Sequence, residues 1–389
     1  MKHWLLSVLL VVCGTVSAQI TLVKDGKSSA RIIVQDKMPN SKTSAQFLQR
    51  FLTEISGVAL PIENDKTPRK GDILIGGQSS AEVTEDGFSI STQDGILKIS
   101  GKENGVVYGV VTLLEQYLGI NYWGENEYSL TPSKTVNLPF INKVENPGFR
   151  YRQTQCYAIH TDSIYKWWNR LEEPNEVFAA GYWVHTFDKL LPSSIYGKEH
   201  PEYYSYFKGK RHPGKASQWC LSNPEVFEIV AQRVDSIFKA NPDKHIMSVS
   251  QNDGNYTNCT CDACKAIDDY EGALSGSIIT FLNKLAARFP DKEFSTLAYL
   301  YTMNPPKHVK PLPNVNIMLC DIDCDREVTL TENASGKEFV KAMEGWSKIT
   351  NNIFVWDYGI NFDNYLAPFP NFHILQDNIR LFEKNHATM

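Results

Sequence analysis

IMSVSQNDGNYTNCTCDACKAID, residues Ile246–Asp268, joins an apolar run, a sharp polar turn and a cysteine-rich loop. The run Ile246–Gln251 is typical of a buried strand in a parallel sheet. The turn Asn252-Asp253-Gly254 then places one carboxylate at the C-terminal end of that strand. In barrels of alternating strands and helices, this edge carries the chemistry. Asp253 is therefore the first candidate catalytic residue, although Asn-Asp-Gly is most often a plain turn.

Around this stretch, from Phe149 onward, short strands alternate with helices, which predicts parallel βα units. We expect seven strands, at Phe149–Gln155, Tyr182–Thr186, Gln218–Ser222, Ile246–Gln251, Ser295–Tyr301, Asn316–Asp321 and Ile353–Tyr358. We expect helices at Asn223–Ala240, Ser275–Phe289, Lys337–Ile349 and Phe372–Asn385. The predicted fold class is α/β, with a TIM-like (β/α) barrel over residues 149–389. Because no eighth strand is recognisable, we expect the barrel to be incomplete at its C-terminal end.

Residues 19–140 show a different pattern, that of a small α+β domain preceding the barrel. Strands are expected at Ile20–Val23, Arg31–Val34, Asp72–Gly76, Phe88–Ser91 and Ile96–Ile99, and helices at Ser41–Ile55 and Asn104–Leu118. Asp94-Gly95 is a favoured hairpin turn between two of these strands. Residues 124–148 are rich in Pro, Asn and Glu, which indicates a connector.

The first eighteen residues have the pattern of a cleaved signal peptide: Lys2 and His3, an apolar run and small residues ending at Ala18. The run is shorter than the roughly 20 residues of a membrane span. Lipoprotein cleavage at Cys13 is the less favoured alternative. We therefore expect a periplasmic or secreted protein without a membrane span. Net charge is −5 and basic runs are lacking, which argues against a nucleic-acid partner. Oligomeric state is not indicated.

Seven of the eight cysteines remain after removal of residues 1–18, an odd number for an oxidising compartment. Cys259, Cys261 and Cys264 are closely spaced, and a fourth thiol from Cys156, Cys220, Cys320 or Cys324 would complete a zinc site. No second Cys-x-x-Cys pair is present at zinc-ribbon spacing. We therefore favour disulfides that staple the loop after Asp253 over a metal, and we predict no cofactor.

Two carboxyl groups are what most glycoside hydrolysis requires, one protonated and one ionised. Asp357 follows the last predicted strand, between Trp356 and Tyr358. We assign Asp253 as general acid and Asp357 as base or nucleophile, with Asp321 and Asp323 as alternates for the second role. Each residue also has a structural alternative. Asp253 could be a turn former, Asp357 could accept a hydrogen bond from a loop amide, and Asp321 and Asp323 could lie in a solvated loop.

Further polar and aromatic residues near the predicted strand ends are candidates for substrate binding. They are Asn252, His185, Trp183, Arg152, Tyr299, Tyr301, Trp356, Tyr358 and Asp321. Aromatic faces suit sugar rings, and an arginine could bind a uronic carboxylate with two hydrogen bonds. An ordinary structural role is about as frequent for His185, and Arg152 could equally be a strut to a neighbouring acid.

Several motifs resemble the bacterial family called domain of unknown function 4838. They are Ser250–Gly254, the three clustered cysteines, Leu297–Tyr299, Pro305–Pro311, Trp356–Tyr358 and Pro368–Asn371. The first unit is similar to the small domain before the barrel of α-glucuronidases and β-N-acetylhexosaminidases, through Ser56-Gly57, Ile73–Gly76, Gly105–Gly109 and Leu113–Glu115. The resemblance implies an exported glycosidase-like barrel. Family members usually continue into an eighth strand containing a Glu, which this chain lacks.

Three hypotheses follow from the sequence. The first is an exported glycoside hydrolase that cleaves a glycosidic bond by carboxylate acid/base chemistry. The second is a non-catalytic carbohydrate-binding protein on the same scaffold, which the Asp in place of a Glu favours. The third is a fragment that lacks a last strand. The separation between the carboxyl groups of Asp253 and Asp357 distinguishes the first two.

Overall fold

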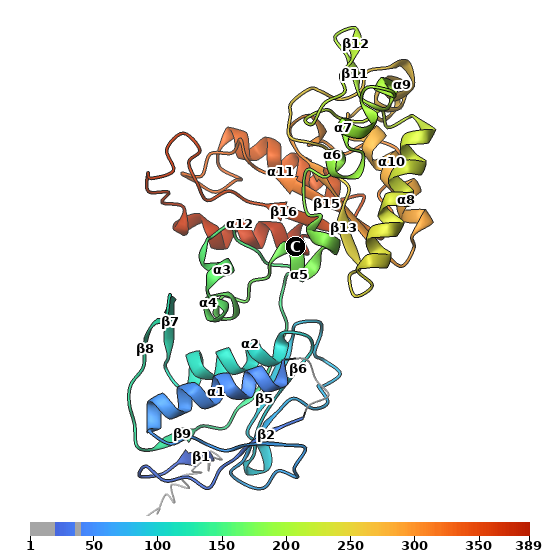
Figure 1. Cartoon of the computed structure of the whole chain (residues 1–389). Helices are drawn as coiled ribbons and strands as arrows, with labels where there is room; N and C mark the ends of the chain where they lie inside the picture. Colours follow the sequence, from blue (N-terminus) through green and yellow to red (C-terminus); the bar gives the residue numbers. More distant parts are fainter. Residues whose placement is uncertain (1–19, 36–39) are drawn as a thin grey trace, which may run out of the picture. The chain divides into compact units, whose positions relative to one another are not determined.

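The computed structural model describes residues 20–35 and 40–389, which form two compact units (Figure 1). The first unit contains the chain up to Pro147 together with Gln155–Leu171. The second contains Gly148–Thr154 and Glu172–Met389. The sequence did not indicate that residues 155–171 belong with the first unit. The predicted signal peptide lies outside the described residues.

A six-stranded mixed sheet, ordered β10-β5-β6-β4-β2-β3, forms the first unit. Its strands are β2 (Ile32–Val34), β3 (Ile62–Asn64), β4 (Ile73–Ile75), β5 (Phe88–Ser91), β6 (Leu97–Gly101) and β10 (Asn142–Glu145). Figure 1 shows α1 (Ser41–Ser56) and α2 (Gly105–Thr112) lying next to each other over this sheet. Their apolar faces and the strands share one buried cluster, as the helical spacing predicted.

The hairpin predicted at Asp94-Gly95 is confirmed, because β5 and β6 pair antiparallel. Asp94 and Gly95 both have positive φ, 58° and 71°, as this turn requires. The connector predicted over 124–148 is wrong, because these residues contain three short strands that pair with others. The remaining elements of the unit are β1 (Ile20–Val23), η1 (Gln93–Gly95), η2 (Leu113–Tyr117), β7 (Asn121–Gly124), β8 (Glu127–Ser129), β9 (Val136–Leu138), α3 (Ala158–Thr161) and α4 (Ser163–Trp168). The strands within 124–148 have three or four residues with only one or two apolar side chains each, so alternation does not reveal them.

A four-stranded parallel sheet, ordered β13-β14-β15-β16, is the centre of the second unit. Its strands are β13 (Ile246–Ser248), β14 (Glu293–Ala298), β15 (Val315–Cys320) and β16 (Ile353–Trp356). These four confirm the last four predicted strands. Both faces of the sheet are buried, which explains why the strands are continuously apolar instead of alternating.

Helices cover one face of this sheet, where Met247, Phe294 and Ile317 share a core with helical side chains. The helices that contribute most are α8 (Pro224–Ala240), α10 (Gly276–Arg288), α11 (Ala334–Ser347) and α12 (Phe372–Lys384). All four were predicted to within a few residues. On the other face, Met318 and Phe354 pack with side chains from outside the regular strands, namely Tyr151, Phe178 and Met389.

Single bridges and hydrogen bonds extend the sheet at both edges. Phe178 pairs in parallel with Ile246, and Ala387 pairs in parallel with Ile353. The amide of Arg150 in turn donates to the Thr388 carbonyl at 2.7 Å. The end of the described chain thus lies beside β16, where the sequence indicated no strand.

The barrel prediction is not confirmed, since residues 20–35 and 40–389 contain no closed barrel of regular strands. The strands predicted at 149–155, 182–186 and 218–222 are irregular segments. The mixed α/β class and the parallel βα arrangement of the second unit are present. None of the described helices has the length and hydropathy needed to cross a membrane.

The remaining elements of the second unit are short, apart from α9. They are α5 (Pro174–Val177), η3 (Ala179–Gly181), α6 (Phe187–Leu190), α7 (Ser193–Tyr196), η4 (Pro201–Tyr203), β11 (Tyr206–Phe207), β12 (Lys210–Arg211), α9 (Asp262–Glu271) and η5 (Leu300–Thr302). The irregular stretch between β13 and α9 contains the turn at Asp253 and two of the clustered cysteines, Cys259 and Cys261, while Cys264 lies in the first turn of α9.

Asp268 on α9 makes the stability of this unit depend on pH. Burial raises the pKa of Asp268 to about 6, although its Oδ1 accepts a 2.8 Å hydrogen bond from the Ser277 amide. The folded chain therefore keeps a proton that the unfolded chain loses near pH 4, so stability falls as pH rises from about 4 through 6. We expect Asp268→Asn to stabilise the protein by about 2 kcal/mol above that window.

Urea unfolding on both sides of the window measures this effect. Asp269→Asn is the matched control, because Asp269 is an exposed neighbour that pairs with Lys265 on the surface. Its effect should stay within about 0.5 kcal/mol at either pH. Equal changes for the two variants would contradict the assignment.

Candidate functional site

The C-terminal ends of β13–β16 bring together most of the polar residues predicted to form a site. Because parallel strands end at one edge of a sheet, residues that directly follow them lie close together. Tyr299 follows β14, Asp321 follows β15 and Asp357 follows β16. Buried polar atoms without a hydrogen-bond partner among the described residues also occur here, namely Gln251 Oε1, Trp183 Nε1 and Asp321 Oδ2. Such atoms are uncommon, and a catalytic role, a bound water or an ion is among the explanations for them.

Asp321 and Asp357 share one counter-charge, Arg326. Arg326 donates a hydrogen bond to Asp321 Oδ1, and its Nε lies 3.6 Å from Asp357 Oδ1. Burial raises the pKa of Asp321 well above its usual range; the Asp357 carboxylate adds to this rise and Arg326 opposes it. One guanidinium therefore holds two carboxyl groups at the ends of adjacent strands.

The two carboxyl groups differ in access to solvent. The side chain of Asp321 is fully buried, whereas that of Asp357 is 30% exposed. Asp357 Oδ1 also accepts a 2.8 Å hydrogen bond from the amide of Tyr358. Asp357 is thus the carboxylate that a substrate can reach, and Asp321 supports it from beneath through Arg326.

Asp253 lies with a second group of residues, Tyr299 and His185. Its side chain is exposed and interacts with the Tyr299 hydroxyl. Burial, with the Asp253 carboxylate next in importance, raises the pKa of Tyr299 to about 12. Burial raises the pKa of Tyr358 as well, and both Asp321 and Asp253 contribute to that rise. The Tyr358 hydroxyl is therefore influenced by both Asp321 and Asp253. No hydrogen bond or ion pair joins Asp253 to Asp357 within the described residues.

His185 takes a strained backbone conformation, with a φ of 50°. Its Nδ1 lies 2.8 Å from the carbonyl oxygen of Gln251, an acceptor, so Nδ1 carries the proton. In the neutral ring, Nε2 is then an acceptor. Within residues 20–35 and 40–389 no partner for Nε2 is present, which leaves it able to accept a hydrogen bond from a ligand hydroxyl.

Trp183, Trp356 and Tyr358 form a stack beside Asp357. The centroids of the two tryptophan rings are 4.9 Å apart, and those of Trp356 and Tyr358 are 5.8 Å apart. Trp356 therefore packs against two other rings, which cover part of its surface. Phe362 continues the row edge-on from Tyr358 and is 52% exposed. The outer end of the row is thus the part open to a ligand.

Three predicted binding residues have structural partners in the described chain. Asn252 is buried, and its side chain bonds to the Asp188 amide and the Ser217 carbonyl. Arg152 Nη2 lies 3.5 Å from Glu172 Oε2, which matches the strut that the sequence allowed. Tyr301 lies against Tyr256, while Tyr299 is the tyrosine beside Asp253 and His185.

Two residues that organise this edge were not identified from the sequence. Arg326 lies in an irregular loop five positions after Asp321, with no local pattern to mark it. Gln218 pairs through its side chain with both peptide groups of Asn252, at 3.0 and 2.8 Å. Its side chain takes the place of a neighbouring strand, and the only signal available was that Gln218 is the polar first residue of the predicted strand Gln218–Ser222.

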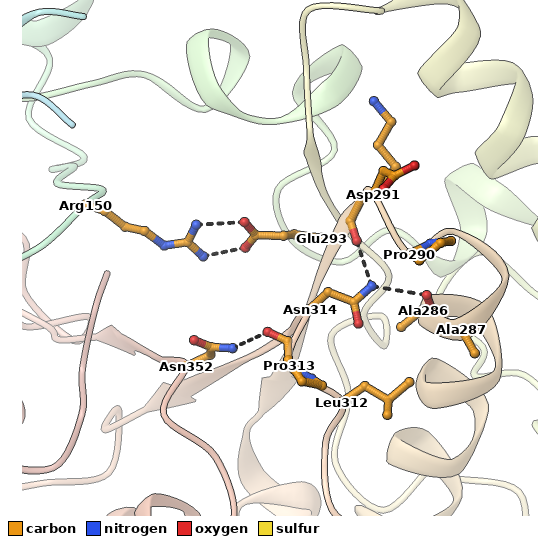
Figure 2. Close-up of a pocket in the computed structure, with 11 residues that line it drawn as sticks. Arg150, Ala286, Ala287, Pro290, Asp291, Glu293, Leu312, Pro313, Asn314 and Asn352 are labelled. Atoms are coloured by element: carbon orange, nitrogen blue, oxygen red, sulfur yellow. Dashed lines mark hydrogen bonds and ion pairs between the residues drawn. The ribbon is translucent and has the colours of Figure 1, made fainter. Parts of the chain in front are cut away.

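A pocket in the second unit lies at the other edge of the sheet, by the start of β14 and β15. Figure 2 shows Arg150 paired through two bonds with Glu293, and Asn314 bonded to neighbouring backbone. Although burial opposes it, the Arg150 ion pair holds the pKa of Glu293 below its usual range. The polar groups here are satisfied by one another, so we do not place chemistry in this pocket.

Solved structures similar to the chain include glycoside hydrolases. β-N-acetylhexosaminidase from Bacteroides fragilis is 10% identical with a TM-score of 0.48, covering 90% of this chain and 76% of that one. Exo β-N-acetylglucosaminidase of GH20 from Vibrio harveyi is 12% identical with a TM-score of 0.43, covering 88% and 58%. A GH138 enzyme targeting pectin rhamnogalacturonan II is 11% identical with a TM-score of 0.48, covering 92% and 45%.

No curated protein sequence matches the chain. A family model described as domain of unknown function (DUF4838) matches residues 122–389, which is more than half of the chain. The match includes all four strands of the parallel sheet and the carboxyl groups of Asp253, Asp321 and Asp357. The family expected from the sequence motifs is therefore confirmed, and the protein belongs to the family of domain of unknown function 4838.

Proposed function

We propose that the protein binds a glycan at the C-terminal edge of β13–β16 and hydrolyses a glycosidic bond there. The single observation that carries this proposal is the Asp357 carboxylate. It is accessible, yet it is held by Arg326 and by the Tyr358 amide beside a row of aromatic rings. A carboxylate fixed in this way is oriented before the substrate arrives, which lowers the cost of reaching the transition state.

The proposed roles follow from what each carboxyl group touches. Asp357 either attacks the anomeric carbon as nucleophile or, as base, takes a proton from the water that attacks it, and Asp253 protonates the leaving oxygen. Asp321 is a positioning residue, because its buried side chain reaches substrate only through Arg326. His185 Nε2 and the Tyr299 hydroxyl are placed to bind sugar hydroxyls.

A panel of aryl-glycosides and aryl-uronides, assayed with the full chain, tests the proposal. Release of the aryl group that is abolished by Asp357→Asn supports it. Proton NMR of the first sugar formed then gives the anomeric outcome. Carboxyl groups about 5–5.5 Å apart give retention, and those about 6.5–9.5 Å apart give inversion.

A non-catalytic carbohydrate-binding protein is the second candidate. Asp253 favours it, because its side chain is exposed and no hydrogen bond or ion pair within the described residues joins it to Asp357. Binding of oligosaccharides without turnover on the whole panel would select this candidate. The same edge of the sheet would then be the binding surface.

Phe362→Ala tests the aromatic row under either candidate. Loss of an exposed stacking ring should weaken glycan binding about 3- to 10-fold, or about 0.5–1.5 kcal/mol. For an enzyme, KM rises while kcat is unchanged, because Phe362 lies outside the carboxylate cluster. Phe372→Ala, at the start of α12, is a matched control because Phe372 is also highly exposed. An unchanged KM or Kd in the Phe362 variant would place the glycan elsewhere.

A further inference from the structure

Four cysteines from distant parts of the second unit meet in one cluster. Cys259, Cys261 and Cys264 lie at or near the start of α9, and Cys220 joins them from an irregular segment before α8. Three of the four are buried. All four are free thiols, and the described residues contain no disulfide bond, contrary to what the sequence favoured.

The spacing of the sulfur atoms matches a tetrahedral metal site. All four lie within 4.8 Å of one another, with Cys220 Sγ 3.6 Å from Cys261 Sγ and 4.0 Å from Cys264 Sγ. A tetrahedral zinc ion with bonds of about 2.3 Å places its sulfur ligands about 3.8 Å apart. Disulfide bonding needs a sulfur–sulfur distance of about 2.05 Å.

The surroundings of the cluster suit negatively charged sulfur. The Tyr206 amide donates to Cys259 Sγ at 3.3 Å, and Arg211 Nη1 donates to it at 3.6 Å. The Ser222 hydroxyl lies 3.1 Å from Cys264 Sγ and 3.8 Å from Cys261 Sγ. Cys261 occupies the N-cap position of α9, where the helix dipole favours anions. Such outer contacts orient the ligands of a metal and offset excess negative charge.

Zinc coordinates thiolate sulfur, so a divalent ion would replace the protons of the four thiols on binding.

We propose that Cys220, Cys259, Cys261 and Cys264 form a structural Zn²⁺ site with four thiolate ligands. Closed tetrahedral sites with four cysteines are the usual form of structural zinc. Soft thiolates in this geometry also select zinc over Mg²⁺ or Ca²⁺, which prefer oxygen ligands. The site is independent of the glycan-binding proposal.

The ion would tie together three segments that have little regular structure. The β11–β12 hairpin reaches the cluster through Tyr206 and Arg211, and the other two segments supply the sulfurs. The third segment begins at Asp253, six positions before Cys259. Zinc therefore stabilises a part of the unit that lies outside the four-stranded sheet, and it limits the positions that the Asp253 turn can take.

Elemental analysis of the full chain, purified without chelators or metal-affinity steps, tests the proposal. We expect one zinc ion per chain, released when a mercurial reagent titrates the thiols. Alkylation followed by peptide mass spectrometry should modify the four cysteines only after the metal is removed. Absence of zinc together with disulfide-linked peptides among the four would overturn the proposal, as would a coloured mononuclear iron site in place of zinc.

Variants give a second, independent readout. Cys220→Ser should reduce zinc to less than about a tenth of an ion per chain, since three thiolates leave the tetrahedron open. Cys156→Ser is the matched control, because Cys156 is exposed and outside the cluster; it should keep the full ion. Cys261→His should also keep it, because three cysteines and one histidine form a common zinc set. If Cys220→Ser fails to fold, the zinc content of the Cys261→His variant still decides.

Discussion

Asp357→Asn is expected to lower kcat/KM on a cleaved aryl-glycoside by about 1,000-fold. Asparagine keeps the shape of the side chain and can still accept the Tyr358 amide hydrogen bond, but it can neither take up a proton nor act as a nucleophile. The expected loss is in kcat, because the contacts to Arg326 and Tyr358 hold ground and transition states alike. Steady-state kinetics on the substrate found in the panel measure it.

The controls for this variant separate chemistry from folding. Asp363→Asn removes an exposed carboxylate from the loop that follows β16 and should leave kcat unchanged. Asp357→Ala opens space beside the reacting carbon, so an added small anion such as azide should restore part of the turnover of a retaining enzyme. A variant Asp357→Asn with normal kcat would exclude Asp357 from the reaction and would favour the binding candidate.

The positions of Asp321 and Asp357 at strand ends were predictable from the sequence, because the apolar run that marks each strand lies directly before the acid. Asp321 and Asp357 directly follow apolar runs that are long enough to indicate buried parallel strands. Once those strands form, the geometry of a parallel sheet brings the two carboxylates to one edge. The same reasoning located the α8, α10, α11 and α12 helices, whose apolar stripes face a shared core.

Features that depend on tertiary partners were not predictable in this way. Gln218–Ser222 was expected to be a strand, yet the Gln218 side chain, not its backbone, pairs with Asn252. Arg326 reaches its two acids only because its loop folds back over the strand ends. Cys220 is separated from Cys259 by 39 positions (259 − 220), so spacing alone could not choose it from four candidates.

Arg326→Met is expected to destabilise the protein by about 3–5 kcal/mol. The substitution keeps the apolar stem of the side chain but removes the only positive charge that contacts Asp321 in the described residues. A buried carboxyl group is then left beside a second one, without the hydrogen bonds that Arg326 donates to its side chain and to its carbonyl oxygen. Urea unfolding, followed by circular dichroism, measures the loss.

The loss should grow with pH. Asp321 already has a raised pKa in the folded protein, and removing Arg326 takes away the one contribution that opposes the rise. The folded state then holds a proton that the unfolded chain releases above about pH 4, so stability falls as pH increases. Arg326→Met should therefore be closer to the wild type at about pH 5 than at about pH 8.

The double variant Arg326→Met/Asp321→Asn tests whether the buried charge causes this loss. Replacing a buried ion pair by neutral groups of similar volume is often close to neutral in stability. The double variant should therefore recover most of the stability and lose the part of the pH dependence that Asp321 causes, because an asparagine at that position cannot titrate. Its kcat should still be low, since Asp357 has lost the guanidinium that positions it 3.6 Å away. A single variant that is equally unstable at both pH values, and is not rescued by Asp321→Asn, would mean that Arg326 acts through packing and not through its charge.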